Sequence, residues 1–489
     1  MSGIWTRAHW IAVGCCLGVF IAAGLIAQTV LEQVPHLEDE VAYLFQAQVF
    51  AAGRLDTPAP LHSNCFFAPF VLDHQGRRFG KYPPGWPALL AIGVRLGQPW
   101  WVNAGGAALA VALTFRLGSE LANRHTAALA AWLAASSPFV LILAASLMSH
   151  TWCMALLTAF VWSFRRSVID SPRPLRWAFA AGTLLGMAFA IRPYTALAVG
   201  FPAMLYTLWR IRRWRAHWRH AWALTVGFVA PALLVPLFNA IWTGDPLLSP
   251  YVLFWPYDRV GFGPGHGPQP EGNTLWIGLG EAVWVTGRLA NWLHGWPALS
   301  LSFVILGFLF KPRRFWDLYL AGTALSLILA YVAYWTNGNV YGPRYTHEVV
   351  ALLTILSANG IERVEAYLRT RRPRAQPAFY GLLATLTAIA LFIYLPWQLH
   401  AYRGLYGITA QPQKIVAQAD LHNALVIVHT GGSWKEYAPL FALNSPTLDG
   451  DIVFASECGP FILSLIAQFS DRQVYYFDGT RISPYHVQQ

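Results

Sequence analysis

Hydrophobic segments recur along most of the chain and are separated by short polar connections. Each run holds about 16 to 22 residues, which matches the ~20 helical residues that cross a bilayer core of ~30 Å. The runs lack the alternating polar face of a soluble surface helix. The pattern therefore predicts eleven membrane-spanning helices, at residues 10–31, 99–118, 126–144, 147–164, 177–191, 194–210, 220–242, 296–311, 317–335, 345–360 and 377–396.

The pattern changes after residue 396, where the chain becomes less apolar. Segments typical of strands lie at 424–430, 451–456 and 474–479, and a helix that starts at a proline is predicted at 460–470. We therefore expect two domains. Residues 1–396 form an all-α polytopic membrane domain, and residues 397–489 form a small α/β domain.

Positive charge is concentrated in every second connection between the predicted spans. More than half of the 34 Lys and Arg residues lie in the segments 1–9, 115–125, 164–177, 209–221, 311–317 and 361–376. Because cytoplasmic connections carry an excess of Lys and Arg, we expect these segments and the N-terminus in the cytoplasm. An odd number of spans then places residues 397–489 outside the membrane, together with two long loops at 32–98 and 243–295.

Composition and motif content exclude several functional classes. Only 12% of the residues are charged and 56% are hydrophobic, which is unusual for a soluble protein. A nucleic-acid-binding protein would gather its positive charge on one soluble face. No phosphate-binding Walker loop, GxGxxG or GxSxG motif occurs, which weakens an ATP-driven pump, a nucleotide-dependent enzyme and a serine hydrolase.

Two of the five cysteines fall in predicted outside segments. Cys65 and Cys458 are candidates for a disulfide there, because an oxidising compartment permits one. The other cysteines lie in predicted spans and are expected to be packing residues.

The most informative polar segment follows the first predicted span. Glu38, Asp39 and Glu40 open an amphipathic helix at 37–55, and Asp39 and Tyr43 share one of its faces. Acids at a helix start are also favourable as caps, by ~0.5–2 kcal/mol. Three acids are more than a cap needs, so capping and chemistry are both open on spacing alone.

Three cationic residues are expected at the outer ends of spans. Lys81 lies in the segment KYPPGWP, Arg192 precedes Pro193, and Arg344 lies in NVYGPRYTHE. Each can hold an anionic group such as a phosphate. The alternatives are interfacial snorkelling for Lys81 and pairing with a protein carboxylate for the two arginines.

Further polar residues lie at the same predicted level of the membrane. His150 stands between the third and fourth spans, and Tyr345, His347 and Glu348 follow Arg344. Together with Tyr43, they are candidates for contacts with a substrate or a metal ion.

These segments together resemble the GT-C superfamily of membrane glycosyltransferases, in particular its protein O-mannosyltransferase and aminoarabinose-lipid A transferase branch. The resemblance rests on Asp39-Glu40 after the first span, KYPPGWP at 81–87, Arg192-Pro193 and Pro343-Arg344-Tyr345. Their order and spacing cover residues 10–360.

The resemblance implies an active site on the outer face and a polyprenyl-phosphate-linked sugar donor. It also implies that Asp39 is the catalytic acid–base residue, with Glu40 beside it, and that Lys81, Arg192 and Arg344 bind the donor phosphate. Many relatives carry an acidic residue in the outside connection between the third and fourth spans, whereas this chain has Ser149-His150 there. That departure leaves open whether a divalent metal ion takes part.

The predicted function is that of a bacterial inner-membrane enzyme that moves a hexosyl or pentosyl group to a glycan, lipid or protein acceptor, with inversion. The residues fit this chemistry independently, because a base must take the acceptor proton and cations must stabilise the leaving phosphate. The alternative is a transporter or flippase of polyprenyl-linked lipids. Such a protein would use the same cations but would not need the acid cluster.

Overall fold

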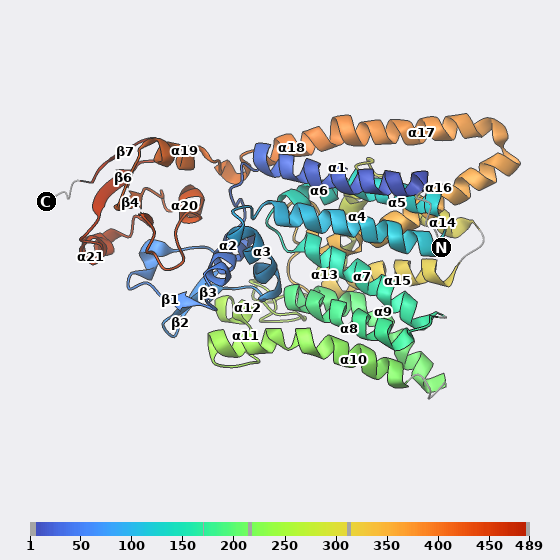
Figure 1. Cartoon of the computed structure of the whole chain (residues 1–489), viewed down its shortest axis with the longest axis horizontal. Coiled ribbons are helices and arrows are strands. Elements are labelled where there is room, and N and C mark those ends of the chain that lie inside the picture. The colour runs from blue at the N-terminus through green and yellow to red at the C-terminus, as the bar shows by residue number, and fades with distance from the viewer. Residues whose placement is uncertain (1–5, 170, 214–217, 311–313, 486–489) are drawn as a thin grey trace.

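A computed structural model describes residues 6–169, 171–213, 218–310 and 314–485. A bundle of helices forms one half of the molecule, the C-terminal sheet forms the opposite end, and short elements from the outer segments lie between them (Figure 1). The main helices of the bundle are α1 (Arg7–Thr29), α4 (Trp101–Leu121), α5 (Arg124–Ala135), α6 (Pro138–Ala145), α7 (His150–Val168), α8 (Pro174–Ile191), α9 (Pro193–Arg213), α10 (Trp218–Ala232), α11 (Leu234–Thr243), α13 (Leu275–Trp292), α14 (Ser302–Leu309), α15 (Phe315–Tyr331), α16 (Val350–Arg371), α17 (Gln376–Ile389) and α18 (Leu395–Tyr402).

Small residues let neighbouring helices of the bundle approach closely. A side chain at Gly182 of α8 would meet the backbone of Leu224 in α10, and one at Gly227 would meet the backbone of Phe179. Close contact through small residues is a common way to pack helices in a membrane. These two helices are consequently among the most tightly packed of the molecule.

Four of the described helices are long and apolar enough to cross a membrane: Arg7–Thr29, Pro174–Ile191, Trp218–Thr243 and Pro373–Gly407. The pair α5 and α6, bent by 54°, would add a fifth. Helices lie at all eleven predicted positions, but some are short. The predicted span 296–311 contains only α14, whose 8 residues cover roughly 12 Å. The chain is a multi-pass membrane protein, and the count of eleven crossings stays a prediction.

The first outer segment folds against the end of the bundle. It contains α2 (Glu38–Ala51), a three-stranded antiparallel sheet in the order β1-β3-β2, the short helix η1 and α3. The strands are β1 (Thr57–Pro58), β2 (Val71–His74) and β3 (Arg77–Gly80), η1 is Ser63–Phe66, and α3 is Gly85–Arg95. The predicted acidic helix is thus present, with its three acids in the first turn.

Residues near the C-terminus form a four-stranded sheet in the order β5-β4-β6-β7, in which only β7 is antiparallel. The strands are β4 (Ala424–Val428), β5 (Ile452–Ser456), β6 (Gln473–Phe477) and β7 (Ile482–Pro484), with helices α19 (Gln411–Gln418), α20 (Trp434–Phe441) and α21 (Ile462–Gln468). The three predicted strands and the predicted helix agree with these positions. We call β4 to β7 the C-terminal sheet.

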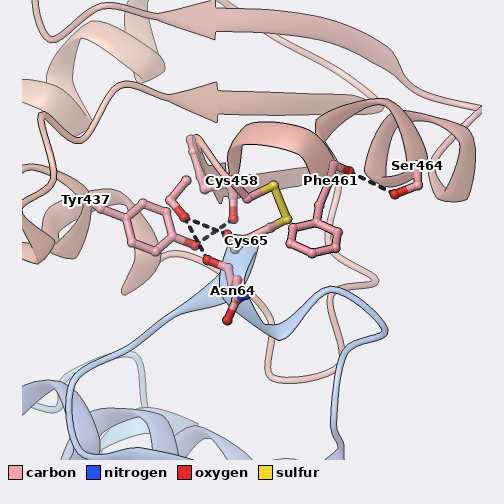
Figure 2. Close-up of a disulfide and its surroundings, with 8 residues drawn as sticks. Asn64, Cys65, Tyr437, Cys458, Phe461 and Ser464 are labelled. Atoms are coloured by element: carbon pink, nitrogen blue, oxygen red, sulfur yellow. Dashed lines mark hydrogen bonds between the residues drawn. A yellow bond between two sulfur atoms is a disulfide. The ribbon is translucent and has the colours of Figure 1, made fainter.

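A disulfide joins the first outer segment to the C-terminal sheet. Cys65 of η1 is bonded to Cys458, which follows β5 and lies 393 residues further along the chain. The Ser456 hydroxyl donates to the carbonyl oxygens of Asn64 and Cys65 beside it (Figure 2). The two cysteines that the sequence left as candidates for a disulfide are thus bonded, and the two segments are fixed to one another.

Candidate active site

A cavity of about 680 Å³ lies where the bundle meets the outer segments. Its volume is typical of sites that enclose a small molecule. Its polar wall comes from the start of α2, the residues after β3, the start of α7, the junction of α8 and α9, the end of α15 and the short helix η3 (Arg344–Val349). Among the predicted site residues, those on the wall are Asp39, Lys81, His150, Arg192, Arg344 and Tyr345.

Asp39 reaches the cavity from the first turn of α2. Its Oδ1 accepts a hydrogen bond of 2.7 Å from the hydroxyl of Tyr82, and its Oδ2 lies 3.5 Å from Nη1 of Arg344. Glu38, the preceding residue, also lines the cavity, and burial raises its pKa. Two adjacent carboxylates therefore face the same space.

Glu40 points away from the cavity, although the sequence grouped it with Asp39. It is fully buried, and its carboxylate accepts backbone N–H groups from His36 and Leu37 before α2 and from Leu147 across the bundle. Burial raises the pKa of Glu40 to about 7, while these N–H groups act in the opposite direction. These hydrogen bonds tie Glu40 to the start of α2, and the catalytic role that the sequence suggested for it stays a prediction.

Lys81 follows directly after β3 and is buried in the cavity wall. Its ammonium lies 2.7 Å from Oδ2 of Asp258 and sits over the rings of Phe70 and Trp255, at 4.5 and 4.1 Å from their centroids. Burial lowers the pKa of Lys81, and the carboxylate of Asp258 opposes this shift. Lys81 is thus held in an aromatic box by a charge partner, and it does not snorkel to the surface.

Arg192 lies at the break between α8 and α9. Its Nε forms an ion pair of 3.0 Å with Glu348, and its other nitrogens donate to the hydroxyls of Tyr331 and Ser149. The carboxylate partner that the sequence left open for this arginine is Glu348. Glu348 is fully buried and stands behind the cavity wall.

The short helix η3 begins with Arg344 and Tyr345, and both residues line the cavity. The Tyr345 ring stacks between Tyr331, at 4.6 Å, and His150, at 6.3 Å. Both ring nitrogens of His150 lack a hydrogen-bond partner among the described residues. Since both arginines, Tyr345 and His150 line one cavity, three segments predicted separately converge at this point.

Two further predicted contacts lie just outside the wall. Tyr43 is buried one turn after Asp39, and its hydroxyl lies 3.1 Å from the Ser149 hydroxyl. His347 is buried against Phe139, with ring centroids 4.9 Å apart. Both residues can support the cavity wall, and neither reaches the cavity surface.

The sequence missed Asp258, although it completes the wall around Lys81. Its Oδ1 accepts hydrogen bonds from the Tyr334 hydroxyl and the Trp335 indole, so both of its oxygens have partners. An acid in the aromatic sequence WPYD of the second outer loop was the available signal. The sequence alone did not connect that acid to a lysine in the first outer loop.

Each of the three predicted phosphate-binding cations is thus matched by one carboxylate. The pairs are Lys81–Asp258, Arg192–Glu348 and Arg344–Asp39. An anion that enters the cavity meets cations that are already placed and whose charges are balanced. For the part of the chain that the structure describes, no group of three His, Cys, Asp or Glu side chains is arranged to hold a metal ion.

Comparison with known proteins bears on the fold that positions these residues. Residues 81–242 match the family model of dolichyl-phosphate-mannose-protein mannosyltransferases. The crystal structure of ArnT from Cupriavidus metallidurans bound to undecaprenyl phosphate is similar to this chain, with a TM-score of 0.62 and 13% identity over 96% of this chain and 93% of that one. Its apo state gives a TM-score of 0.55 and 14% identity over 95% and 93%. No curated protein matches the chain in sequence.

These matches confirm the predicted resemblance to the GT-C superfamily. The chain has the fold of these membrane glycosyltransferases over nearly its whole length. The family-model match covers KYPPGWP and Arg192-Pro193, two of the motifs on which the resemblance rests.

Proposed function

We propose that this protein transfers a sugar from a polyprenyl-phosphate donor to the hydroxyl group of an acceptor, at the outer face of the bacterial inner membrane. The GT-C fold supports a membrane glycosyltransferase. The structurally similar ArnT was crystallised with undecaprenyl phosphate, which supports a donor of the same class here. The acceptor is a lipid, a glycan or a protein.

One observation carries the proposal: a carboxylate and three cations line a single cavity. Asp39 lies on the same wall as Lys81, Arg192 and Arg344. Sugar transfer from a phosphate requires this combination, since a base must take a proton while negative charge grows on the leaving group.

The step balances with these residues. The acceptor oxygen attacks the anomeric carbon of the sugar, and Asp39 takes the proton of the acceptor hydroxyl. The bond between the anomeric carbon and the phosphate oxygen breaks, and polyprenyl phosphate leaves with one more negative charge. The three cations stabilise that charge. A single displacement of this kind inverts the configuration of the anomeric carbon.

The disulfide supports the proposed orientation. Cys65 and Cys458 are bonded, and disulfides persist on the oxidising side of the bacterial inner membrane. We therefore place the loops 32–98 and 243–295 and the domain at 397–489 outside, and the N-terminus in the cytoplasm. In this orientation the membrane domain at 1–396 opens its cavity to the outer face.

The test is a transfer assay with purified protein in lipid vesicles. Radiolabelled polyprenyl-phosphate sugars are offered together with a membrane extract as acceptor, and wild type is compared with Asp39→Asn. Label should move to an acceptor with the wild type only. Labelled lipid that crosses the bilayer without any transfer would contradict the proposal and favour the transporter.

A further inference from the structure

The three ion pairs around the cavity are not equivalent. The closest, Lys81–Asp258 at 2.7 Å, is almost fully buried, and hydrogen bonds from two aromatic side chains fix its carboxylate. In the second pair, Arg192–Glu348 at 3.0 Å, the carboxylate is fully buried behind the wall. Hydrogen bonds thus hold the carboxylate of Asp258 in place, whereas burial alone keeps that of Glu348 away from a ligand in the cavity.

The third pair, Arg344–Asp39, is longer and more open. The atoms lie 3.5 Å apart, and 16% of the Asp39 side chain remains exposed, compared with 2% for Asp258 and none for Glu348. Both members of this pair line the cavity. Lys81 and Asp258 line the cavity as well but are almost fully buried, so Arg344–Asp39 is the pair that is most open to a ligand.

Arg344 also keeps unused capacity for hydrogen bonding. Its Nε–H is buried and has no hydrogen-bond partner among the described residues. A buried donor without a partner is unfavourable. A guanidinium offers Nε–H and Nη–H side by side, which is the arrangement that binds two oxygens of one phosphate. Arg344 therefore contributes one half of a phosphate site to the cavity wall, and its Nη1 lies beside the Asp39 carboxylate.

We propose that the donor phosphate takes Arg344 away from Asp39 and thereby releases Asp39 to act as the base. This inference rests on the proposed function and adds an order of events to it. Before the donor binds, Asp39 serves as the counter-ion of Arg344. When the phosphate arrives, Arg344 pairs with it through Nε–H and Nη–H. Asp39 then keeps the hydrogen bond from Tyr82 and can accept the proton of an acceptor hydroxyl.

The exchange also implies an order of events, in which the donor binds before Asp39 can act as the base. While Asp39 is paired with Arg344 it also accepts the hydrogen bond from Tyr82, so both of its carboxylate oxygens already have partners. The donor would therefore bind first, and hydroxyl groups that reach an empty cavity would find Asp39 occupied. Lys81 and Arg192 stay paired with their own carboxylates during this exchange. Their positive charges contribute to phosphate binding from within these fixed ion pairs.

A double-mutant cycle on the binding of polyprenyl phosphate tests this inference. Polyprenyl phosphate is the proposed product, so its binding can be measured by calorimetry in detergent or nanodiscs without any turnover. The variants are Asp39→Asn, Arg344→Gln and the combination of the two. Glu38→Gln is the matched control, because it removes the same charge from the neighbouring residue on the same cavity wall.

Asp39→Asn should bind polyprenyl phosphate roughly 5- to 20-fold more tightly than wild type, since a competing carboxylate is gone. Glu38→Gln should give a clearly smaller gain. In the Arg344→Gln background the gain from Asp39→Asn should shrink to that of Glu38→Gln. Folding of each variant is checked by its thermal unfolding temperature.

Two results would overturn the exchange. One is an unchanged affinity of Asp39→Asn, and the other is an equal gain with and without Arg344, which would indicate only a general effect of charge. If wild type binds no polyprenyl phosphate at all, the proposed function fails as well. The two failures are therefore distinguishable in one set of measurements.

Discussion

The first outer segment has two sides that are built differently. The side facing the cavity presents Asp39 and Lys81, and each of these charges has a single ionic partner from a distant part of the chain. The side facing the C-terminal sheet is closed by the disulfide of Cys65 and by a small apolar core around Phe66. The comparison teaches that this segment is anchored covalently on one side, while on the other side its charged groups are held only by ion pairs, one of which we propose to exchange.

The largest effect is expected on the cavity side, from Asp39→Asn. The amide cannot take the acceptor proton, so the rate of sugar transfer should fall by ~10²–10⁴-fold. The thermal unfolding temperature should stay close to that of wild type, because Asp39 is partly exposed and makes few contacts. A turnover assay of Asp39→Asn beside Glu38→Gln measures this. Equal losses in the two variants would contradict a special role for Asp39.

The next effect is expected on the anchored side, from the double variant Cys65→Ser, Cys458→Ser. Loss of a disulfide typically costs ~2–4 kcal/mol of stability. Limited proteolysis should therefore cut the C-terminal sheet faster, while the transfer rate falls far less than in Asp39→Asn. If the transfer activity were lost together with the disulfide, the anchored side and the cavity side of the segment would not be independent of one another.

A smaller loss of stability is expected from Glu40→Gln. The glutamate carboxylate accepts three backbone N–H groups, and the amide nitrogen of glutamine cannot accept any. A lost acceptor for a buried donor costs ~1–3 kcal/mol. Chemical or thermal unfolding in detergent measures this cost. Transfer per folded molecule should remain, and a variant that is stable but inactive would instead point to Glu40 in the chemistry.

The smallest effect concerns the pH dependence of donor binding. A lysine carries its charge below its pKa, and burial lowers the pKa of Lys81 from its ordinary value of 10.5. Lys81 therefore becomes neutral at a lower pH than an exposed lysine, and affinity for the donor should decline on the alkaline side, below pH 10.5. The Michaelis constant for the donor, measured against pH, checks this.

Lys81→Arg supplies the control for the pH measurement. Arginine stays charged throughout the accessible range, so the alkaline decline should disappear in this variant. A decline that is identical in wild type and Lys81→Arg would show that another group titrates.

The sequence predicted the elements around the cavity better than it predicted the partners within it. The structure agrees with the predicted helix α2, which has its three acids in the first turn, and with the predicted strands of the C-terminal sheet. The two candidate cysteines, Cys65 and Cys458, are bonded. These features are local, or in the case of the disulfide they follow from a small number of cysteines. Hydrophobic patterns and turn residues report local structure directly.

The partners could not be predicted, because they join segments far apart in the sequence. Nothing around Lys81 indicates Asp258, and nothing around Arg192 indicates Glu348. The same limit explains Glu40, which sits beside Asp39 in the sequence but bonds to Leu147 and does not line the cavity. The residue types indicated a polar site, but only the fold shows which of the three acids line the cavity.

A structure of the protein with bound polyprenyl phosphate, determined by electron cryomicroscopy in nanodiscs, tests the central claim most directly. The account predicts the phosphate in the cavity between Lys81, Arg192 and Arg344, with oxygens at about 2.7–2.9 Å from the Arg344 guanidinium. It also predicts that Arg344 has left Asp39. A phosphate bound elsewhere on the molecule, with the cavity empty and Arg344 still paired with Asp39, would contradict it.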